Sequence, residues 1–378
     1  MSENVLNVMN YGAIGDGKRD DSQAFLRVWE AACQTTQVPK VFIPNRTFLL
    51  KPLTFSGPCK SSLIYFQIMG KIVAPNSKNA WSGRPTNTWL FFYGINGLSL
   101  SGSGQFDGQG SIWWSNPCMH NSAQNAAGKC KAPAVVTFKR CNNLKINGLT
   151  YINPMNNHMQ LTTCKNVNIS HIRINAPKNS PNTDGIDIAN SHSVKIRNSV
   201  ITTGDDCIAI SGGSSDIDIS GIFCGPGHGI SVGALGHGGY DVVENVKVYN
   251  CTFKETLTGV RIKSWQGGEG YVRNVSFSRI KFIAVYNPII IDQYYWLLFY
   301  WKTSAVKVSD VSFTSIVGTS NMDQVINLSC SKSFGCTNIV LDRIDISLAT
   351  KGRKPFATFI NAHGKATNTK PAIKCLLP

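Results

Sequence analysis

The sequence predicts an all-β fold, a right-handed parallel β-helix in which each coil contributes short strands to sheets along the solenoid. A segment of alternating polar and apolar residues recurs at intervals of 23 to 36 residues, too short for a helix-containing repeat and long enough for one coil. Asparagine recurs at the turns, where it tolerates a left-handed backbone and can bond to the residue stacked above. The aliphatic anchors of these segments are Leu144, Val167, Val194, Ile217, Val246, Val275, Val311 and Ile339.

The alternative all-β architectures are a β-sandwich and a propeller. The irregular spacing of the repeats and the lack of a blade signature disfavour both. No composition shift or linker separates a second domain, so we expect one β-helix domain over residues 1–378.

The open ends of a solenoid need covers, because an exposed strand edge pairs with other chains. We expect a short capping helix at about residues 20–33, where four apolar residues share one helical face. The stretch at about 351–378 is basic, contains Pro and Gly and lacks periodicity, so we expect a tail packed loosely along the coils. The four residues of the helix face are Phe25, Val28, Trp29 and Ala32.

The charge balance predicts a polyanionic partner. Lys and Arg total 37 against 21 Asp and Glu, a net charge of +16, which suits nucleic acid, an anionic membrane or an acidic polysaccharide. A nucleic-acid binder would be expected to interleave aromatic residues with Lys and Arg along a groove, and the sequence contains no such run. No segment approaches the roughly 18 apolar residues of a membrane span. We therefore expect a soluble monomer that binds neither nucleic acid nor membrane.

The 12 cysteines contain no CxxC pair, which favours disulfides in an oxidising compartment over zinc or thioredoxin-like chemistry. Cys207 and Cys224 are close enough in sequence to join neighbouring coils, and Cys330 with Cys336 could close a tight loop. The chain begins without a signal-peptide pattern, so we expect a secreted protein whose leader is not present in this chain. Glycosylation sequons, which suit secretion, begin at Asn45, Asn168, Asn250, Asn274 and Asn327.

A second set of strands carries the candidate chemistry. Aligning the aliphatic residues Ile186, Ile208, Ile230 and Val260 places them on successive coils of one sheet. Residues two places before each anchor then form a column with roughly 4.8 Å per coil. The residues that this alignment gathers are Asp184, Asp206 and His228 in the column, Asp205 beside it, and Arg261 with Lys263 projecting from one face of the last strand.

Each aspartate alone is typical of a turn cap, which accepts backbone N–H bonds. A column of like charges is costly unless the site holds a shared proton or a cation. Such a cluster could hydrolyse a glycosidic bond or bind calcium. The neighbouring His228, Arg261 and Lys263 favour hydrolysis, because positive groups would weaken a calcium site but would position an anionic sugar. We therefore expect neither a metal nor a cofactor.

Four motifs, in their order and spacing, resemble the signature of polygalacturonases, glycoside hydrolase family 28. They are "NTD" at 182–184, "GDD" at 204–206, "GHG" at 227–229 and "RIK" at 261–263. The segments "NVMNYGAIGDGKRDDSQAF" and "SGSGQFDGQGSIWW" resemble plant members. The resemblance implies an inverting hydrolase of α-1,4-linked galacturonan in the cell wall.

The resemblance also implies roles for individual residues. Asp205 would be the general acid, and Asp184 with Asp206 would activate the water. His228 would tune the cluster, while the substrate would be held by Arg261, Lys263, Asn182 and Tyr295, the last within "PIIIDQYY".

The mode of action stays open between internal and terminal cleavage, and we expect an endo enzyme. A non-catalytic pectate-binding wall protein would keep the basic face but could lose a carboxylate, and the full set argues against it. A pectate lyase would need calcium and a basic proton abstractor.

The chain departs from the expected plant pattern at "WLLFYW", Trp296–Trp301, where we expect a cysteine and a polar loop. Large apolar residues in a loop are hazardous unless they are buried or stacked on sugar. We favour burial against the adjacent sheet over a sugar platform.

Overall fold

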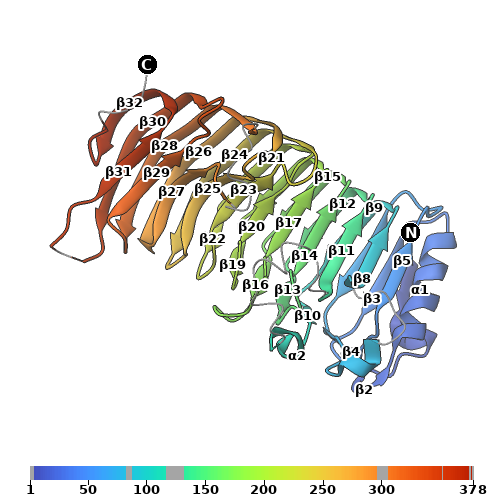
Figure 1. Ribbon diagram of the computed structural model, residues 1–378. Coiled ribbons are helices and arrows are strands. Elements are labelled where there is room, and N and C mark those ends of the chain that lie inside the picture. The colour runs from blue at the N-terminus through green and yellow to red at the C-terminus, as the bar shows by residue number, and fades with distance from the viewer. Residues whose placement is uncertain are drawn as a thin grey trace. The chain divides into compact units, whose positions relative to one another are not determined.

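The chain forms two compact units, Met1–Ile186 and Asp187–Pro378, in the computed structural model of the protein. Each unit is a stack of coils made of short parallel strands, so the predicted right-handed parallel β-helix is confirmed (Figure 1). That residues 1–378 act as one domain stays a prediction. The structure describes residues 4–81, 87–115, 132–295, 305–350, 352–373 and 376.

The first unit, coloured blue to green in Figure 1, contains helix α1 (Ser22–Gln34) near its N-terminus. The indole of Trp29 meets the rings of Phe55, Phe66 and Phe92 at centroid distances of 5.5 to 6.3 Å, and its N–H donates to Ser56 O at 3.1 Å. The helix therefore covers the first coils with an apolar face, as predicted. That face comprises the buried residues Phe25, Val28, Trp29 and Ala32.

Three columns of parallel strands build the first unit. One column runs β1–β3–β6–β9–β12–β15, a second runs β2–β4–β7–β10–β13–β16, and a third runs β5–β8–β11–β14. The strands are β1 (Asn4–Asn7), β2 (Asp16–Asp20), β3 (Pro39–Ile43), β4 (Thr47–Leu49), β5 (Leu53–Ser56), β6 (Ile64–Ile68), β7 (Lys71–Val73), β8 (Thr88–Tyr93), β9 (Asn96–Ser101), β10 (Gln105–Asp107), β11 (Ala134–Lys139), β12 (Asn142–Asn147), β13 (Thr150–Ile152), β14 (Met159–Thr162), β15 (Lys165–Ser170) and β16 (Arg173–Asn175). The short helices are η1 (Val8–Tyr11), η2 (Lys78–Trp81) and α2 (Ser111–Trp114), and β17 (Ile186–Ala189) begins at the last residue of the unit.

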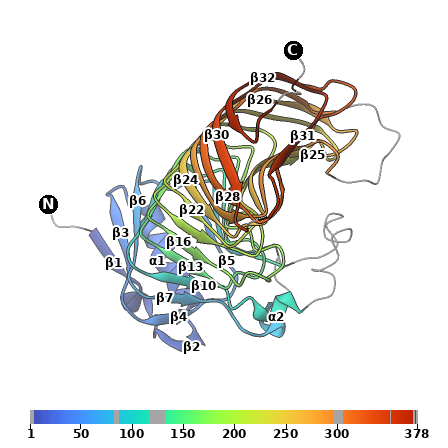
Figure 2. The ribbon, with the colours of Figure 1, turned by 90° about the vertical axis from the view of Figure 1, so that its left-hand side faces the viewer.

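The second unit has the same construction, with a long column β18–β21–β24–β26–β28–β30–β32, part of which Figure 2 shows in yellow to red. A second column, β20–β23–β25–β27–β29–β31, carries the candidate site on its first strands. Strand β19 pairs with β22, which pairs with β24 of the long column. The strands are β18 (His192–Arg197), β19 (Val200–Thr202), β20 (Ile208–Ile210), β21 (Ser214–Ser220), β22 (Phe223–Cys224), β23 (Ile230–Leu235), β24 (Tyr240–Lys254), β25 (Thr258–Ser264), β26 (Glu269–Val285), β27 (Asn287–Asp292), β28 (Lys307–Ser320), β29 (Gln324–Ser329), β30 (Cys336–Leu348), β31 (Phe356–Ile360) and β32 (Ala362–Lys370). No helix among the described residues is long and apolar enough to span a bilayer.

The predicted anchors set the register inside each unit. Leu144 lies opposite Val167 in the first unit. In the second unit Val194, Ile217, Val246, Val275, Val311 and Ile339 lie opposite one another in that order.

Asparagines at the turns form ladders along the coils, as predicted. Asn143 and Asn166 have φ values of 53° and 58°, in the left-handed region. The Asn166 amide donates to Asn143 at 2.6 Å, and the Asn143 amide donates to Asn96 at 2.7 Å. These bonds satisfy side chains at positions where most residues would strain the backbone.

The expectation of a loose C-terminal tail is wrong. Strands β31 and β32 pair in parallel with β29 and β30, for example Phe359 opposite Leu328 and Lys365 opposite Val340. Most side chains of these two strands are half-buried or exposed. Backbone hydrogen bonds therefore hold this last coil, and its side chains carry no apolar period that the sequence could reveal.

Three disulfides link cysteines among the described residues. Cys207–Cys224 and Cys330–Cys336 form as predicted, and Cys33–Cys59 ties the end of α1 to the following coil. These bonds suit the oxidising compartment that the cysteine count indicates.

Replacing Trp29 with alanine should test the capping helix. The side chain is 4% exposed and packs against three phenylalanine rings, so Trp29→Ala should lower the free energy of unfolding by about 3–5 kcal/mol. Urea unfolding measures this, with Gln23→Ala on the exposed face of α1 as control. A loss below about 1 kcal/mol would mean that the helix covers no essential core.

Candidate active site

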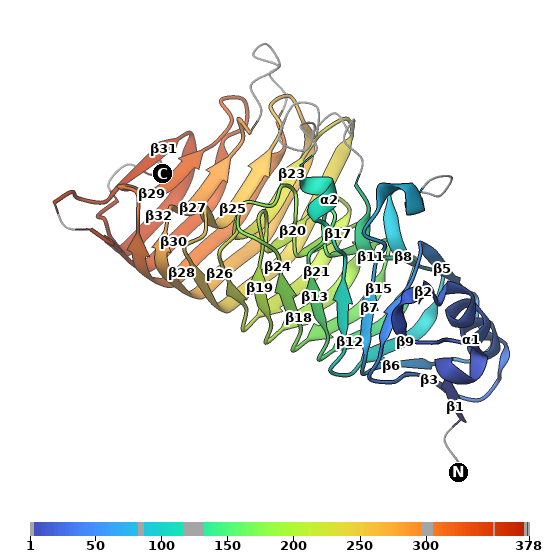
Figure 3. The ribbon, with the colours of Figure 1, turned by 90° about the horizontal axis from the view of Figure 1, so that it is seen from below.

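The site lies at the starts of strands β20 and β23 and along strand β25, which are neighbours in the second unit (Figure 3). Ile208 lies opposite Ile230, which lies opposite Val260, so the predicted alignment of these three anchors is confirmed. Asp205 and Asp206 therefore precede β20 on one coil, and His228 precedes β23 on the next.

Asp206 is a buried carboxylate with a partner for each oxygen. Its Oδ1 accepts hydrogen bonds from Arg261 Nη2 at 2.8 Å and from Ser231 Oγ at 2.9 Å, and its Oδ2 accepts from Lys263 Nζ at 2.9 Å. Only 1% of the residue is exposed. Burial alone would make such a charge very costly, so the two cations are a condition for its ionisation.

The ionisation state of Asp206 follows from this competition. Burial raises its pKa, but the positive charges of Lys263 and Arg261 outweigh burial, and the net pKa lies below the ordinary value. Burial also works against the charged forms of Lys263 and Arg261, yet Asp206 raises their pKa values overall. All three groups are therefore charged together.

Asp205 occupies a different environment although it adjoins Asp206 in sequence. Its side chain is 27% exposed, and Oδ1 lies 2.9 Å from His228 Nδ1, whose side chain is 31% exposed. The same oxygen accepts the N–H of Asp206 at 2.9 Å. One carboxyl is thus buried and locked, while its neighbour faces solvent and a titratable imidazole.

The position after His228 requires a glycine, because the backbone of the next coil packs closely against it. Gly229 has φ +81°, and a Cβ there would lie 2.1 Å from the carbonyl oxygen of Gly259. No side chain fits this approach, so the second glycine of "GHG" lets the turn after His228 pack against the next coil.

Arg261 and Lys263 share one face of β25, as the alternation predicts, and that face is covered. They are only 9% and 7% exposed, and both contact Asp206. The alternation of β25 was interpreted correctly, but the outward face is itself covered. Their contact with a sugar carboxylate stays a prediction.

Tyr295 lies beside this cation pair, and its assignment to substrate binding stays a prediction. Lys263 Nζ lies 5.0 Å and Arg261 Cζ lies 5.9 Å from the centroid of its ring. Such distances allow attraction between a cation and the face of an aromatic ring.

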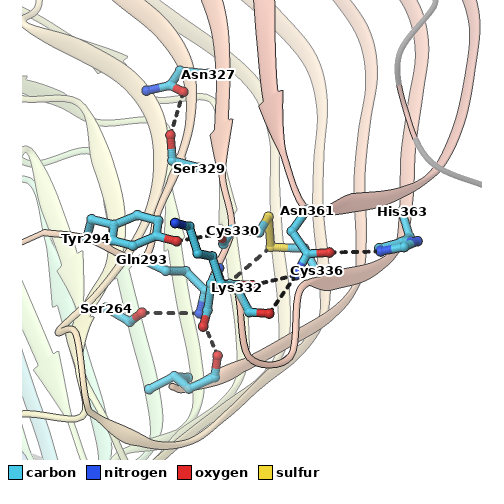
Figure 4. The surroundings of a disulfide bond; sticks show 12 residues. Ser264, Gln293, Tyr294, Asn327, Ser329, Cys330, Lys332, Cys336, Asn361 and His363 are labelled. Atoms are coloured by element: carbon cyan, nitrogen blue, oxygen red, sulfur yellow. Dashed lines mark hydrogen bonds between the residues drawn. A yellow bond between two sulfur atoms is a disulfide. The ribbon is translucent and has the colours of Figure 1, made fainter. Parts of the chain in front are cut away.

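The loop that carries Tyr295 is anchored through Gln293 (Figure 4). Gln293 is 2% exposed; its amide donates to Val306 O at 2.6 Å, and its carbonyl accepts the N–H of Ser331 at 2.9 Å, beside the Cys330–Cys336 disulfide. The neighbouring hydroxyl of Tyr294 donates to Cys330 O at 3.3 Å. The disulfide loop therefore supports the backbone that leads to Tyr295.

Asn182 and Asp184 lie in the first unit, in the turn before β17. The carbonyl oxygen of Asp184 accepts the backbone N–H of His158 at 2.9 Å and lies 2.8 Å from its Nδ1. Because a carbonyl only accepts, Nδ1 carries the hydrogen and donates. His158 thus holds the backbone of Asp184. The convergence of Asp184 and Asn182 on Asp205 stays a prediction.

The sequence analysis missed Ser231, His158 and Gln293. Ser231 had a signal, since it occupies an outward position on β23 opposite Arg261. Nothing in "NNHMQL" marks His158, and nothing in "DQYY" shows which side chain points inward. The segment Trp296–Trp301 lies outside the described residues.

Asp205, Asp206 and His228 also offer ligand atoms within 4.8 Å of one another. The two cations on Asp206 would repel a metal ion there, so the donor set fits a cation poorly. A locked anionic carboxylate, an accessible carboxyl and an imidazole suit acid–base chemistry better.

Comparison with known proteins identifies the relatives of this arrangement. Residues 33–367 match the family described as Glycosyl hydrolases family 28. A probable polygalacturonase from Arabidopsis thaliana is 45% identical over 99% of this chain and 81% of its own length. Polygalacturonase-2 from Solanum lycopersicum is 38% identical over 95% of this chain and 78% of its own length.

Solved structures share the fold at lower identity. The exopolygalacturonase from Thermotoga maritima has a TM-score of 0.80 and 19% identity, covering 98% of this chain and 92% of its own. The endo-xylogalacturonan hydrolase from Aspergillus tubingensis has a TM-score of 0.77 and 24% identity, covering 99% of each chain.

His158 should make the protein less stable in acid. Burial lowers its pKa from 6.5 to about 4 against the opposing hydrogen bond to Asp184 O, so the unfolded chain binds a proton more readily than the folded one. The contribution of His158 to the free energy of unfolding should therefore be complete above pH 6.5 and should decrease as the pH drops toward 4. At about 1.4 kcal/mol per pH unit the loss is on the order of 3 kcal/mol.

His158→Gln removes this titration while keeping an amide donor near Asp184. Urea unfolding at pH 7, 5.5 and 4.5 should give a flatter pH dependence for the variant than for the parent. Parallel curves would show that His158 takes up its proton equally in both states.

Proposed function

The chain belongs to glycosyl hydrolases family 28, and we propose that it hydrolyses α-1,4 bonds between galacturonic acid units of pectin by an inverting acid–base mechanism. The observation that carries this is the unequal pair of adjacent carboxyls. Asp206 is held ionised by Arg261 and Lys263, while Asp205 is accessible and contacts His228. Carboxyls whose environments differ in this way can divide the acid and base roles.

The proposed reaction begins with proton donation by Asp205. Its proton passes to the glycosidic oxygen as the bond from that oxygen to the anomeric carbon breaks. A water attacks the anomeric carbon from the opposite face and gives up a proton. Asp205 then regains a proton from solvent, with His228 Nδ1 held 2.9 Å from its carboxylate oxygen.

Asp184 and Asp206 share the task of activating the water, but they do so unequally. A carboxylate with a lowered pKa is a weak base, so Asp206 orients the water and Asp184 receives its proton. Asp206 has both oxygens bonded to cations, which fixes its position but reduces its basicity.

The substrate class follows from charge. Arg261, Lys263 and Tyr295 lie together in the second unit and would hold a galacturonate carboxylate, and Asn182 is assigned to substrate binding by its motif alone. The net charge of +16 supports a polyanionic chain as the larger partner. The disulfides and the plant relatives support secretion to the cell wall.

We propose endo action. The turn beside the site exposes His237, and a Cβ on Gly238 or Gly239 would meet no atom within 4 Å, so a polymer can continue past this side. Exo action is the alternative, since solved relatives of this fold include an exopolygalacturonase. A pectate-binding protein without activity is the remaining alternative.

Asp205→Asn should keep the fold and pectate binding while lowering turnover of polygalacturonate by a factor on the order of 10² or more, because the amide cannot donate the proton. Reducing-end release measures turnover. Asp345→Asn, which removes an exposed carboxylate on β30, is the matched control. Near-normal turnover in Asp205→Asn would assign the proton to another group.

The first products should have inverted configuration. An activated water needs space between the carboxyls, roughly 6.5 to 9.5 Å, and direct attack converts the α bond to a β reducing end. Proton NMR of early digests should show β anomers, and chromatography of the same samples should show oligomers. Early α anomers would require a covalent intermediate, and monomer as the first product would indicate exo action.

A further inference from the structure

A pocket of about 430 Å³ lies in the second unit, outside the carboxylate cluster. The turn after β23 and the turn after β25 form its walls, with Gly236, His237, Trp265, Gln266 and Glu269 among the lining residues. Its volume is in the range of small-ligand sites. None of the residues to which the proposed reaction gives a role lines it.

Aromatic rings connect this pocket to the proposed galacturonate site. The ring of Trp265 lies 6.2 Å from that of Tyr295 in an edge-to-face arrangement, and Tyr295 lies over the ammonium of Lys263. On its other side, Trp265 lies 4.3 Å from the ring of His237. The pocket is therefore connected to Asp206 by a series of side-chain contacts that runs through Lys263, Tyr295 and Trp265.

The walls of the pocket are fixed by close packing. The N–H of Gly236 donates to Asp241 Oδ2 at 2.8 Å, and a Cβ on Gly236, at φ +83°, would lie 2.6 Å from Gly268 Cα. By contrast, a Cβ on Gly239 would meet nothing within 4 Å. The base is rigid and the rim is open, which suits a site that forms before its ligand arrives.

The charge of the pocket differs from that of the neighbouring site. Among its described lining residues there is no lysine or arginine, and Glu269 supplies a carboxylate. Tyr240, which is 68% exposed, lies opposite Glu269 in the register of β24 and β26. An ionised uronate would be repelled here, whereas an uncharged sugar could lay its apolar face on an indole or phenol ring.

We propose that this pocket binds a methyl-esterified galacturonate unit of a pectin chain, next to an ionised unit at Arg261, Lys263 and Tyr295. The ester removes the charge that Glu269 opposes and adds an apolar methyl group. This inference rests on the proposed function. It implies that the enzyme accepts an esterified unit beside the ionised one.

Glu269→Gln tests the charge of the pocket. The measured quantity is the ratio of kcat/KM on partly methyl-esterified pectin to kcat/KM on polygalacturonate. Losing the carboxylate should lower this ratio about three- to tenfold, by raising the rate on the ionised polymer. Glu255→Gln, an exposed carboxylate elsewhere in the second unit, should leave the ratio unchanged.

Gly239→Leu tests the space of the pocket. The new side chain extends from the open rim, so it should lower kcat/KM on esterified pectin several-fold more than on polygalacturonate. If the ratio is unchanged in both Glu269→Gln and Gly239→Leu while the parent hydrolyses polygalacturonate, the pocket inference is overturned alone. A parent that releases no reducing ends from either polymer overturns the proposed function and this inference together.

Discussion

The buried ion triad of Asp206, Arg261 and Lys263 is the interaction on which the site depends. Removing one partner of such a cluster leaves an uncompensated buried charge, which typically costs 3–5 kcal/mol. The triad also joins the turn before β20 to β25, with Ser231 of β23 bonded to both Asp206 and Arg261. A single carboxylate thus pairs with both buried cations and links three coils.

The coil period explains how residues distant in sequence meet there. Parallel strands in register turn a sequence separation of one coil into a spacing of roughly 4.8 Å. Ser231 lies opposite Arg261, and Asp206 and His228 each stand two places before a paired anchor. Any insertion within one of these coils must be absorbed in a turn, because a shift of one residue on a strand would reverse every side chain.

Sequence reasoning succeeded where a residue's place follows from period alone. The anchors Ile208, Ile230 and Val260 fixed the register, and that register located Asp206 and His228. Sequence reasoning failed where the burial of a residue depends on other parts of the fold. Alternation shows which face of the strand Arg261 occupies but not which residues cover that face. Sequence reasoning also failed at strands β31 and β32, whose pairing rests on backbone hydrogen bonds that leave no apolar pattern.

The charge count of the triad limits what the site can bind. Two cations and one carboxylate leave one net positive charge beside Tyr295, enough to attract a single sugar carboxylate. A second ionised unit further along would find no cation among the described residues of the Trp265 pocket and would meet Glu269. The same arrangement that keeps Asp206 ionised therefore places positive charge on the Tyr295 side of Trp265 and a carboxylate, Glu269, on the pocket side, which is the charge difference on which the proposed selectivity rests.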